Sequence, residues 1–149
     1  MEYYTWTLRV SAAGKDRATV FARTHQYSVG APVQFDAAYD AITALEYVLG
    51  AIGADIVNGF QTLARKRRVE VDQVEAVVGG KLNNPLTYLG VVGESGHPGL
   101  ERVSVKVYVA SIAAEEEVRR VWQETLDKSP LVRTFQPAIR FEINLQVVL

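Results

Sequence analysis

Residues 41–55 read AITALEYVLGAIGAD, an apolar stretch in which the only charged side chains are Glu46 and Asp55. The apolar pattern continues to Ala64 and places large side chains on every side of a helical projection. A helix that is apolar all round is enclosed by other parts of a structure. The 149 residues include no cysteine. The sequence therefore predicts one long, buried helix in a protein without thiol chemistry.

Length and composition are typical of one globular domain, which we expect to cover residues 1–149. The net charge of −1 argues against general attraction to nucleic acid or to anionic membranes. The basic run at 65–68 is explained more simply by the C-terminal dipole of the long helix. The first ten residues lack the pattern of a signal peptide, and polar residues interrupt the long apolar segment. We therefore expect a cytoplasmic protein with no nucleic-acid or membrane partner.

Alternating and helical patterns predict an α+β fold with mainly antiparallel sheets. Gly79 to Pro85 has the composition of a turn, and a bulge is expected at 72–73. Strands are expected at 3–10, 17–23, 25–29, 33–35, 69–78, 103–109 and 139–147, and helices at 41–64, from 115 and after Ser129.

The start of the long helix offers two capping residues, Asp40 and Thr43, and Glu46 stands three residues after Thr43 as in a capping box. Glycines at 50, 53 and 59 are unfavourable inside a helix by roughly 1 kcal/mol each. Close approach of another backbone explains them, and a helix from a second subunit would provide it.

The stretch from Ala41 to Asp55 closely resembles the central helix of the OsmC/Ohr family, whose pattern is xTPxEYLLAALGxC. Members of that family reduce peroxides with two cysteines, and the attacking cysteine of the pattern corresponds to Asp55. The second cysteine precedes a proline, and Ser129 precedes Pro130 at the matching place. Ala44 stands where the family usually has proline. The resemblance extends over essentially the whole chain and implies an OsmC-like fold around a central helix, in an intertwined homodimer.

The family's reaction requires a thiolate that attacks the O–O bond and a second thiol that discharges the sulfenic acid. A carboxylate at 55 and a hydroxyl at 129 can do neither. The sequence therefore predicts an OsmC-like protein without cysteine-dependent peroxidase activity.

Asp55 requires an explanation, because an unpaired, ionised carboxylate inside a protein costs several kcal/mol. It is neutral, paired with a cation, or open to a wet cavity. The resemblance points to Arg23 as the partner, since a family arginine stabilises the thiolate, while Arg9 and Arg17 are alternatives. Asn58 lies three residues after Asp55 and shares its helical face.

Two further residues have both a site role and a structural one. The resemblance implies that Glu46 holds the arginine, but it equally fits a cap of its own helix. Ser129 is a common N-cap before Pro130. As a nucleophile it would need a base, for which the sequence offers only His25 and His97, and no nucleophile-elbow pattern supports a triad. The two histidines form no recognisable metal-ligand set, so no metal or cofactor is expected.

Three functional hypotheses are open. The first is a stress-related or small-molecule-binding homodimer, with a degenerate site at the subunit interface formed by Asp55, Ser129 and an arginine. The second is a non-thiol enzyme, a hydrolase or proton-transfer catalyst, with Asp55 as the base and an arginine as the anion holder. The third is a structural or interaction protein without a site.

Overall fold

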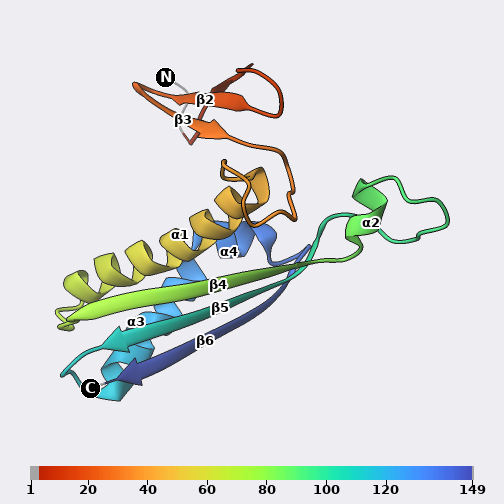
Figure 1. The fold of residues 1–149 in the computed structure, drawn as a ribbon. Coiled ribbons are helices and arrows are strands. Elements are labelled where there is room, and N and C mark those ends of the chain that lie inside the picture. Colours follow the sequence, from red (N-terminus) through yellow and green to blue (C-terminus); the bar gives the residue numbers. More distant parts are fainter. Residues whose placement is uncertain (1–3, 149) are drawn as a thin grey trace. The chain divides into compact units, whose positions relative to one another are not determined.

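The computed structural model describes residues 4–148, whose contacts gather in two compact units, Met1–Val48 and Leu49–Leu149 (Figure 1). The expected α+β class is confirmed, with antiparallel pairing in both sheets. The assignment of residues 1–149 to one domain stays a prediction. The bounds of each element follow by unit.

The N-terminal unit holds a three-stranded antiparallel sheet in the order β1-β2-β3, and the strands are β1 (Arg9–Ala12), β2 (Ala18–Ala22) and β3 (His25–Val29). The register places Val10, Val20 and Tyr27 opposite one another on one apolar face. The Tyr27 ring lies 5.1 Å from that of Tyr47, centroid to centroid. The apolar face therefore has a partner within its own unit at Tyr47.

The first strand is shorter than expected. Its ladder with β2 begins at Arg9, which pairs with Phe21, so residues 5–8 lie outside it, and residue 3 lies outside the described residues. The expected strand at 33–35 is wrong. There the amides of Phe35 and Asp36 donate to the side chain of Gln34 and not to a neighbouring strand.

Arg17 fixes the β1–β2 turn to the loop that precedes the long helix. Its Nη1 donates to the Tyr39 hydroxyl at 2.6 Å, and its Nη2 pairs with the carboxylate of Asp40. The Tyr39 hydroxyl in turn accepts from the amide of Ala31 at 2.9 Å. Asp40 therefore binds an arginine and does not cap the helix.

Helix α1 (Ala44–Lys66) starts with the expected capping box. The Thr43 hydroxyl accepts from the Glu46 amide at 3.1 Å, and the Glu46 carboxylate accepts from the Thr43 amide at 3.0 Å. Farther along, one face of the helix is fully buried, at Ile52, Ile56 and Phe60. The opposite face is exposed in the single chain, at Gly50, Ala51, Ala54 and Asn58.

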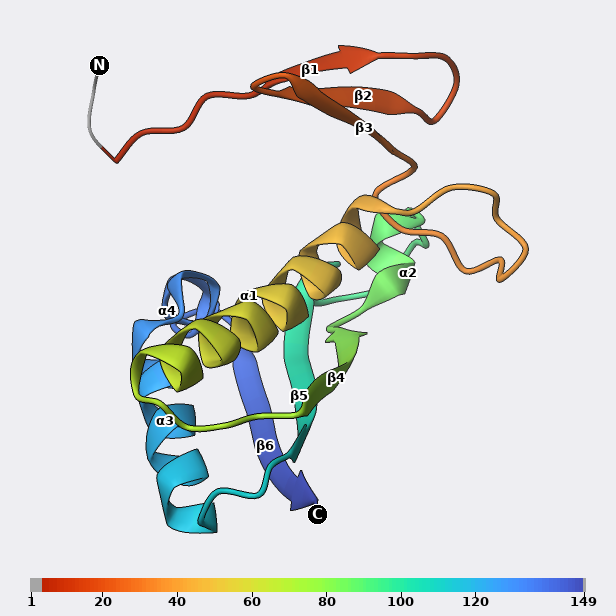
Figure 2. The same ribbon diagram turned by 90° about the vertical axis from the view of Figure 1, so that its left-hand side faces the viewer.

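The second sheet has the order β4-β5-β6 and is formed by β4 (Gln73–Leu82), β5 (Leu100–Ala110) and β6 (Arg140–Val148). The β4–β5 pair is antiparallel, whereas β5–β6 is parallel, because α3 (Glu115–Lys128) and α4 (Pro130–Phe135) form the crossover between them. Helices α1 and α3 cover the same face of this sheet (Figure 2). That face carries Val103, Val105, Val107 and Val109, all almost fully buried.

The expected turn at 79–85 is wrong, because β4 continues to Leu82 before the short helix α2 (Pro85–Tyr88). Gly80 pairs with Val103, and a Cβ atom at Gly80 would lie 2.9 Å from the Leu49 side chain. The glycine therefore lets α1 approach the strand and does not break it. The register shift falls at Lys81/Leu82 and not at the expected 72–73.

Gly53 of α1 gives a prediction about this close packing. A Cβ atom there would lie 2.6 Å from Cγ2 of Val78, a stiff β-branched side chain in β4. Overpacking costs about 1–3 kcal/mol, which exceeds the gain of about 1 kcal/mol in helix propensity. We expect Gly53→Ala to lower the free energy of unfolding measured by urea denaturation. The control is Gly50→Ala, where no atom lies within 4 Å, and an equal loss in both variants would contradict the packing argument.

A second prediction concerns acid. Hydrogen bonds from Arg67 and Lys128 lower the pKa of Glu124 from 4.5 to about 2. Because the folded-state pKa is depressed, this carboxylate stabilises the fold above pH 4.5, and the contribution is lost as the pH falls toward 2. The stability difference between wild type and Glu124→Gln should therefore shrink over that interval. Denaturant titrations between pH 6 and pH 2 measure it, and a constant difference would contradict the assignment.

Candidate functional site

Asp55 and Ser129 lie in direct contact, although 74 positions separate them in the sequence. Asp55 projects from the middle of α1, and Ser129 stands between α3 and α4. The Ser129 hydroxyl donates to Oδ2 of Asp55 at 2.5 Å, and the Leu131 amide donates to the same oxygen at 3.1 Å. Ser129 is only 3% exposed, whereas Asp55 is half-buried. The two residues form one hydrogen-bonded unit.

This pair completes the N-terminal cap of α4. Pro130 has no amide hydrogen, Leu131 donates to Asp55, and Val132 donates to the Ser129 hydroxyl at 3.2 Å. The next amide, that of Arg133, donates to the carbonyl of Ser129 at 3.0 Å. Each donor in the first turn of α4 is therefore satisfied, two of them by the side chains of Asp55 and Ser129.

No cation pairs with the carboxylate of Asp55 among the described residues. Both of its hydrogen bonds come from neutral donors, and none of the ion pairs among residues 4–148 includes it. Both bonds also end on Oδ2. Oδ1 is therefore the atom that can accept a hydrogen bond from a ligand or from a second subunit.

The remaining candidates of the sequence analysis lie elsewhere. Glu46 accepts from the amide and the hydroxyl of Thr43, which lowers the pKa of its carboxyl below the usual value. Asn58 is exposed on α1, one turn after Asp55. The capping role of Glu46 is thus present in the structure, and its role in a pocket stays a prediction.

The three candidate arginines all belong to the N-terminal unit. Arg23 occupies the β2–β3 turn with a positive φ of 57° and is exposed. The guanidinium of Arg9 lies 4.0 Å from the centroid of the Phe21 ring, and Arg17 binds Tyr39 and Asp40. Among these three candidates, only Arg23 has a guanidinium with no hydrogen bond, ion pair or aromatic contact within residues 4–148. Its pairing with Asp55 stays a prediction.

Sequence reasoning missed the part played by backbone amides. The Leu131 amide binds Asp55 directly, and the only signal for it was Pro130, which marks the first position of a helix.

Among the described residues, no group of three or more histidine, aspartate or glutamate side chains could hold a metal ion. None of the helices in that part of the chain is long and apolar enough to span a bilayer.

Two hollows lie near the C-terminal helices. A groove of about 650 Å³ borders Arg67, Val121 and Glu124, and neither Asp55 nor Ser129 lines it. A smaller one of about 300 Å³ is lined in part by Leu126 and Val132, each three positions from Ser129 in the sequence. The candidate site is therefore defined by the hydrogen bonds of Asp55, because the larger groove does not include that residue.

Comparison with known proteins agrees with the resemblance drawn from the sequence. A family model described as OsmC-like protein matches residues 37–144. Among curated proteins, none matches this chain. An OsmC-like protein from Mycoplasma pneumoniae has a similar structure, with a TM-score of 0.82 at 14% identity, over 99% of this chain and 100% of that chain.

Other solved structures share the fold. An organic hydroperoxide resistance protein OsmC from Legionella pneumophila matches with a TM-score of 0.71 at 9% identity, over 99% of this chain and 100% of that one. A hypothetical protein from Aquifex aeolicus matches with a TM-score of 0.76 at 15% identity, over 99% and 98% of the two chains. The match of the family model covers well over half of the residues, and the chain therefore belongs to the OsmC-like protein family.

Proposed function

We propose that this protein is a cytoplasmic, stress-related OsmC-like homodimer without thiol peroxidase activity, which binds a small polar or amphipathic molecule beside Asp55 and Ser129 at the subunit interface. The observation that carries the proposal is the hydrogen bond between these two side chains, at the positions that correspond to the thiol pair of the family. The pair retains a polar contact but has no sulfur with which to reduce a peroxide.

Apolar surface supports the homodimer. In the single chain Trp6 is 80% exposed and Val10 is 63% exposed, and α1 presents small residues on an open face. Exposed aromatic and aliphatic side chains at this density are typical of a protein–protein interface. Light scattering coupled to gel filtration should give twice the mass of the 16.5 kDa chain. A monomer at micromolar concentration would refute the interface.

The charge of Asp55 suggests what the ligand carries. Oδ1 is an acceptor without a partner among the described residues, and no cation neutralises the carboxylate there. A ligand with a cationic or hydrogen-donating group and an apolar body complements such a site. Rhodamine 6G, a cationic amphipathic dye, is a suitable probe.

The dye experiment isolates the charge. Asp55→Asn keeps an oxygen that can accept from Ser129 and Leu131 but removes the negative charge. We expect fluorescence anisotropy to show dye binding by wild type and at least fivefold weaker binding by Asp55→Asn. Asp127→Asn, which removes an exposed carboxylate from α3, is the matched control. Equal affinity of all three proteins would exclude Asp55 from the site.

A separate assay addresses the missing thiol chemistry. Wild-type protein should not consume cumene hydroperoxide in the presence of dithiothreitol. The double variant Asp55→Cys/Ser129→Cys restores two sulfur atoms at contacting positions, and we expect peroxide treatment to remove two titratable thiols per chain. Each single variant can form a sulfenic acid but no disulfide within the chain, so without dithiothreitol it should lose one titratable thiol and not two. Consumption by wild type above the buffer rate would overturn the proposal.

The short Ser129–Asp55 bond also favours a second function, a non-thiol hydrolase or proton-transfer enzyme. A carboxylate within 2.5 Å of a buried hydroxyl can accept its proton, and an arginine would then hold the anion that forms. Hydrolysis of p-nitrophenyl acetate distinguishes the two functions. Activity that Ser129→Ala abolishes would support the enzyme, and a rate equal to that of buffer would exclude it for this ester.

A further inference from the structure

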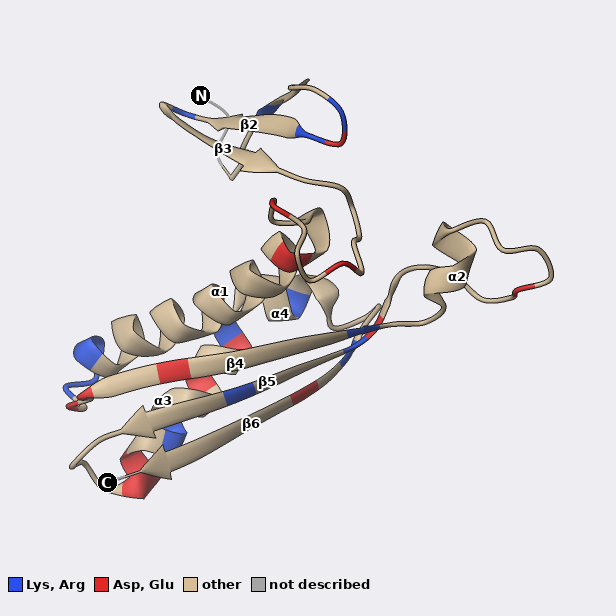
Figure 3. Cartoon of the chain, in the orientation of Figure 1, with Lys and Arg blue, Asp and Glu red and all other residues tan. Residues whose placement is uncertain are grey.

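Three cations lie opposite one another across the second sheet. Lys81 of β4 pairs in register with Arg102 of β5, which pairs with Arg140 of β6. Residues that are directly opposite share one face of a sheet. We call these three residues the cation row. Figure 3 shows basic residues side by side where β4 ends and β5 and β6 begin. The strand spacing makes the row about 10 Å wide from the first backbone to the third.

The acids near the cation row pair with two of its three cations. Glu101 lies 3.8 Å from Lys81, and Glu142 lies 3.6 Å from Arg102. Both separations exceed hydrogen-bond length. Arg140 belongs to none of the ion pairs that the described residues form. Like charges directly opposite each other destabilise a sheet, and the row keeps one positive charge, that of Arg140, for a further anion to neutralise.

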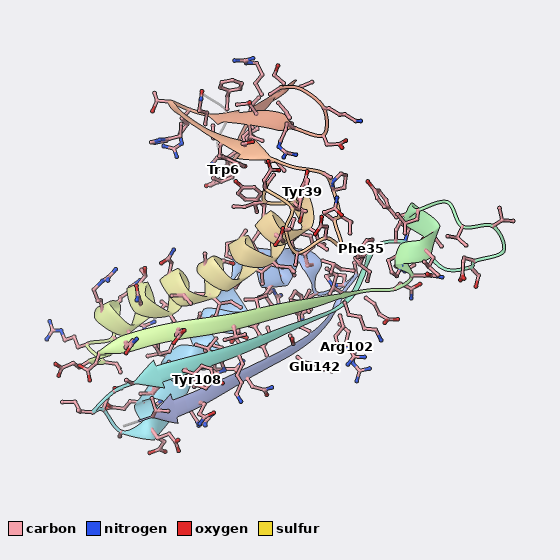
Figure 4. The ribbon with its side chains drawn as sticks, in the orientation of Figure 1. Trp6, Phe35, Tyr39, Arg102, Tyr108 and Glu142 are labelled. Carbon is pink, nitrogen blue, oxygen red and sulfur yellow. The ribbon has the colours of Figure 1, made fainter. Side chains whose placement is uncertain are left out.

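One hydrogen-bond donor of Arg102 has no acceptor among the described residues. Its Nε atom is buried and has no hydrogen-bond partner among residues 4–148, while its side chain as a whole is 40% exposed. Figure 4 shows its side chain near that of Glu142. A buried donor without an acceptor is costly, and a rotation of the guanidinium that brings Nε to a ligand oxygen would recover that free energy.

The next level of the sheet leaves room beside Arg102. Gly79 pairs with Ser104, and Ser104 pairs with Glu142, so this level carries a hydroxyl on β5, a carboxylate on β6 that pairs with Arg102, and no side chain on β4. A Cβ atom at Gly79 would lie only 3.0 Å from Oγ of Ser104. The glycine thus keeps the space over the serine hydroxyl open on the face that bears the cation row.

We propose that the cation row binds a phosphate group, either as the free ion or as the phosphomonoester of a small molecule. The guanidinium of Arg102 is the fork that grips two phosphate oxygens, and the Ser104 hydroxyl donates to a third. Arg140 and Lys81 supply the remaining positive charge. This site shares no residue with the pair Asp55 and Ser129 and goes beyond the function proposed for them.

The proposal is tested by titrating the full-length, isotope-labelled protein with sodium phosphate, against sodium chloride at equal ionic strength. We expect saturable shifts of the amide resonances of Arg102, Ser104 and Arg140 with phosphate only. Equal shifts with chloride would overturn the site. Glycerol 3-phosphate in a parallel titration identifies the source, because tighter binding than inorganic phosphate indicates a phosphomonoester and weaker binding indicates the free ion.

Variants separate a built site from general attraction. Arg140→Gln should weaken phosphate binding about tenfold or more, since a charge-assisted hydrogen bond is lost. The matched control is Arg133→Gln, which removes an exposed arginine from α4. Arg102→Lys keeps the charge but removes the fork, and it should also weaken binding. Equal weakening by Arg140→Gln and Arg133→Gln, or binding of a single-stranded oligonucleotide with no binding of either small phosphate, would overturn the proposal.

Discussion

Asp55→Ala is expected to lower the free energy of unfolding by about 3 kcal/mol. The change removes a carboxylate that accepts from the Ser129 hydroxyl and from the Leu131 amide. A hydrogen bond to a charged group contributes about 1.5–3 kcal/mol, and the two bonds share one oxygen, so their sum is not fully additive. Ser129 is buried, and its hydroxyl would lose its acceptor. Urea denaturation followed by circular dichroism measures the loss.

Asp55→Asn is the control for this prediction. An amide oxygen in place of Oδ2 still accepts from both donors, so a loss of about 1 kcal/mol is expected from the weaker, uncharged bonds. A similar loss in both variants would show that the charge matters more than the cap. A surface substitution typically changes the free energy of unfolding by no more than roughly 0.5 kcal/mol. A loss no larger than that for Asp55→Ala would mean that α4 does not depend on Asp55.

Phe60→Ala is expected to cost about 3–5 kcal/mol, the range for a large aromatic removed from a packed core. Phe60 is fully buried on α1, and its ring centroid lies 6.3 Å from that of Trp122 on α3. The truncation would therefore leave a cavity between two helices that pack on the same sheet. Denaturant unfolding monitored by tryptophan fluorescence reports both the stability and the loss of the Trp122 environment.

The surface variant Val77→Ala controls for Phe60→Ala. Val77 is 60% exposed on the other face of β4, so its truncation should change stability by no more than about 0.5 kcal/mol. If Phe60→Ala cost no more than Val77→Ala, α1 and α3 would not share a packed core.

Periodicity predicted the elements that carry their own signal. The alternation at Val103, Val105, Val107 and Val109 marks β5, and the stripe beginning at Val118 marks α3, because each pattern repeats with the period of its structure. The end of β4 could not be predicted in this way. Its two glycines resemble a turn, and the approach of Leu49 to Gly80 and of Ser104 to Gly79 arises only when distant segments pack.

The candidate site could likewise be predicted in part, for the side chains that carry a pattern of their own. The family pattern pointed to Asp55 and Ser129, which the structure brings into contact. The capping box of Thr43 and Glu46 followed from spacing alone. The amide of Leu131 could not be foreseen, because a backbone donor has no residue-type signature. The choice among arginines depends on tertiary contacts, which spacing does not encode.

The cap of α4 has a consequence for how such a protein can change through mutation. Asp55 and Ser129 each hold an amide of the same helix, so exchanging either one for cysteine weakens the structure before any redox function appears. A single exchange is therefore expected to lower stability without providing the second thiol that a redox cycle requires. The first turn of α4 thus depends on two side-chain oxygens, and sulfur at both positions would require that turn to be stabilised in another way.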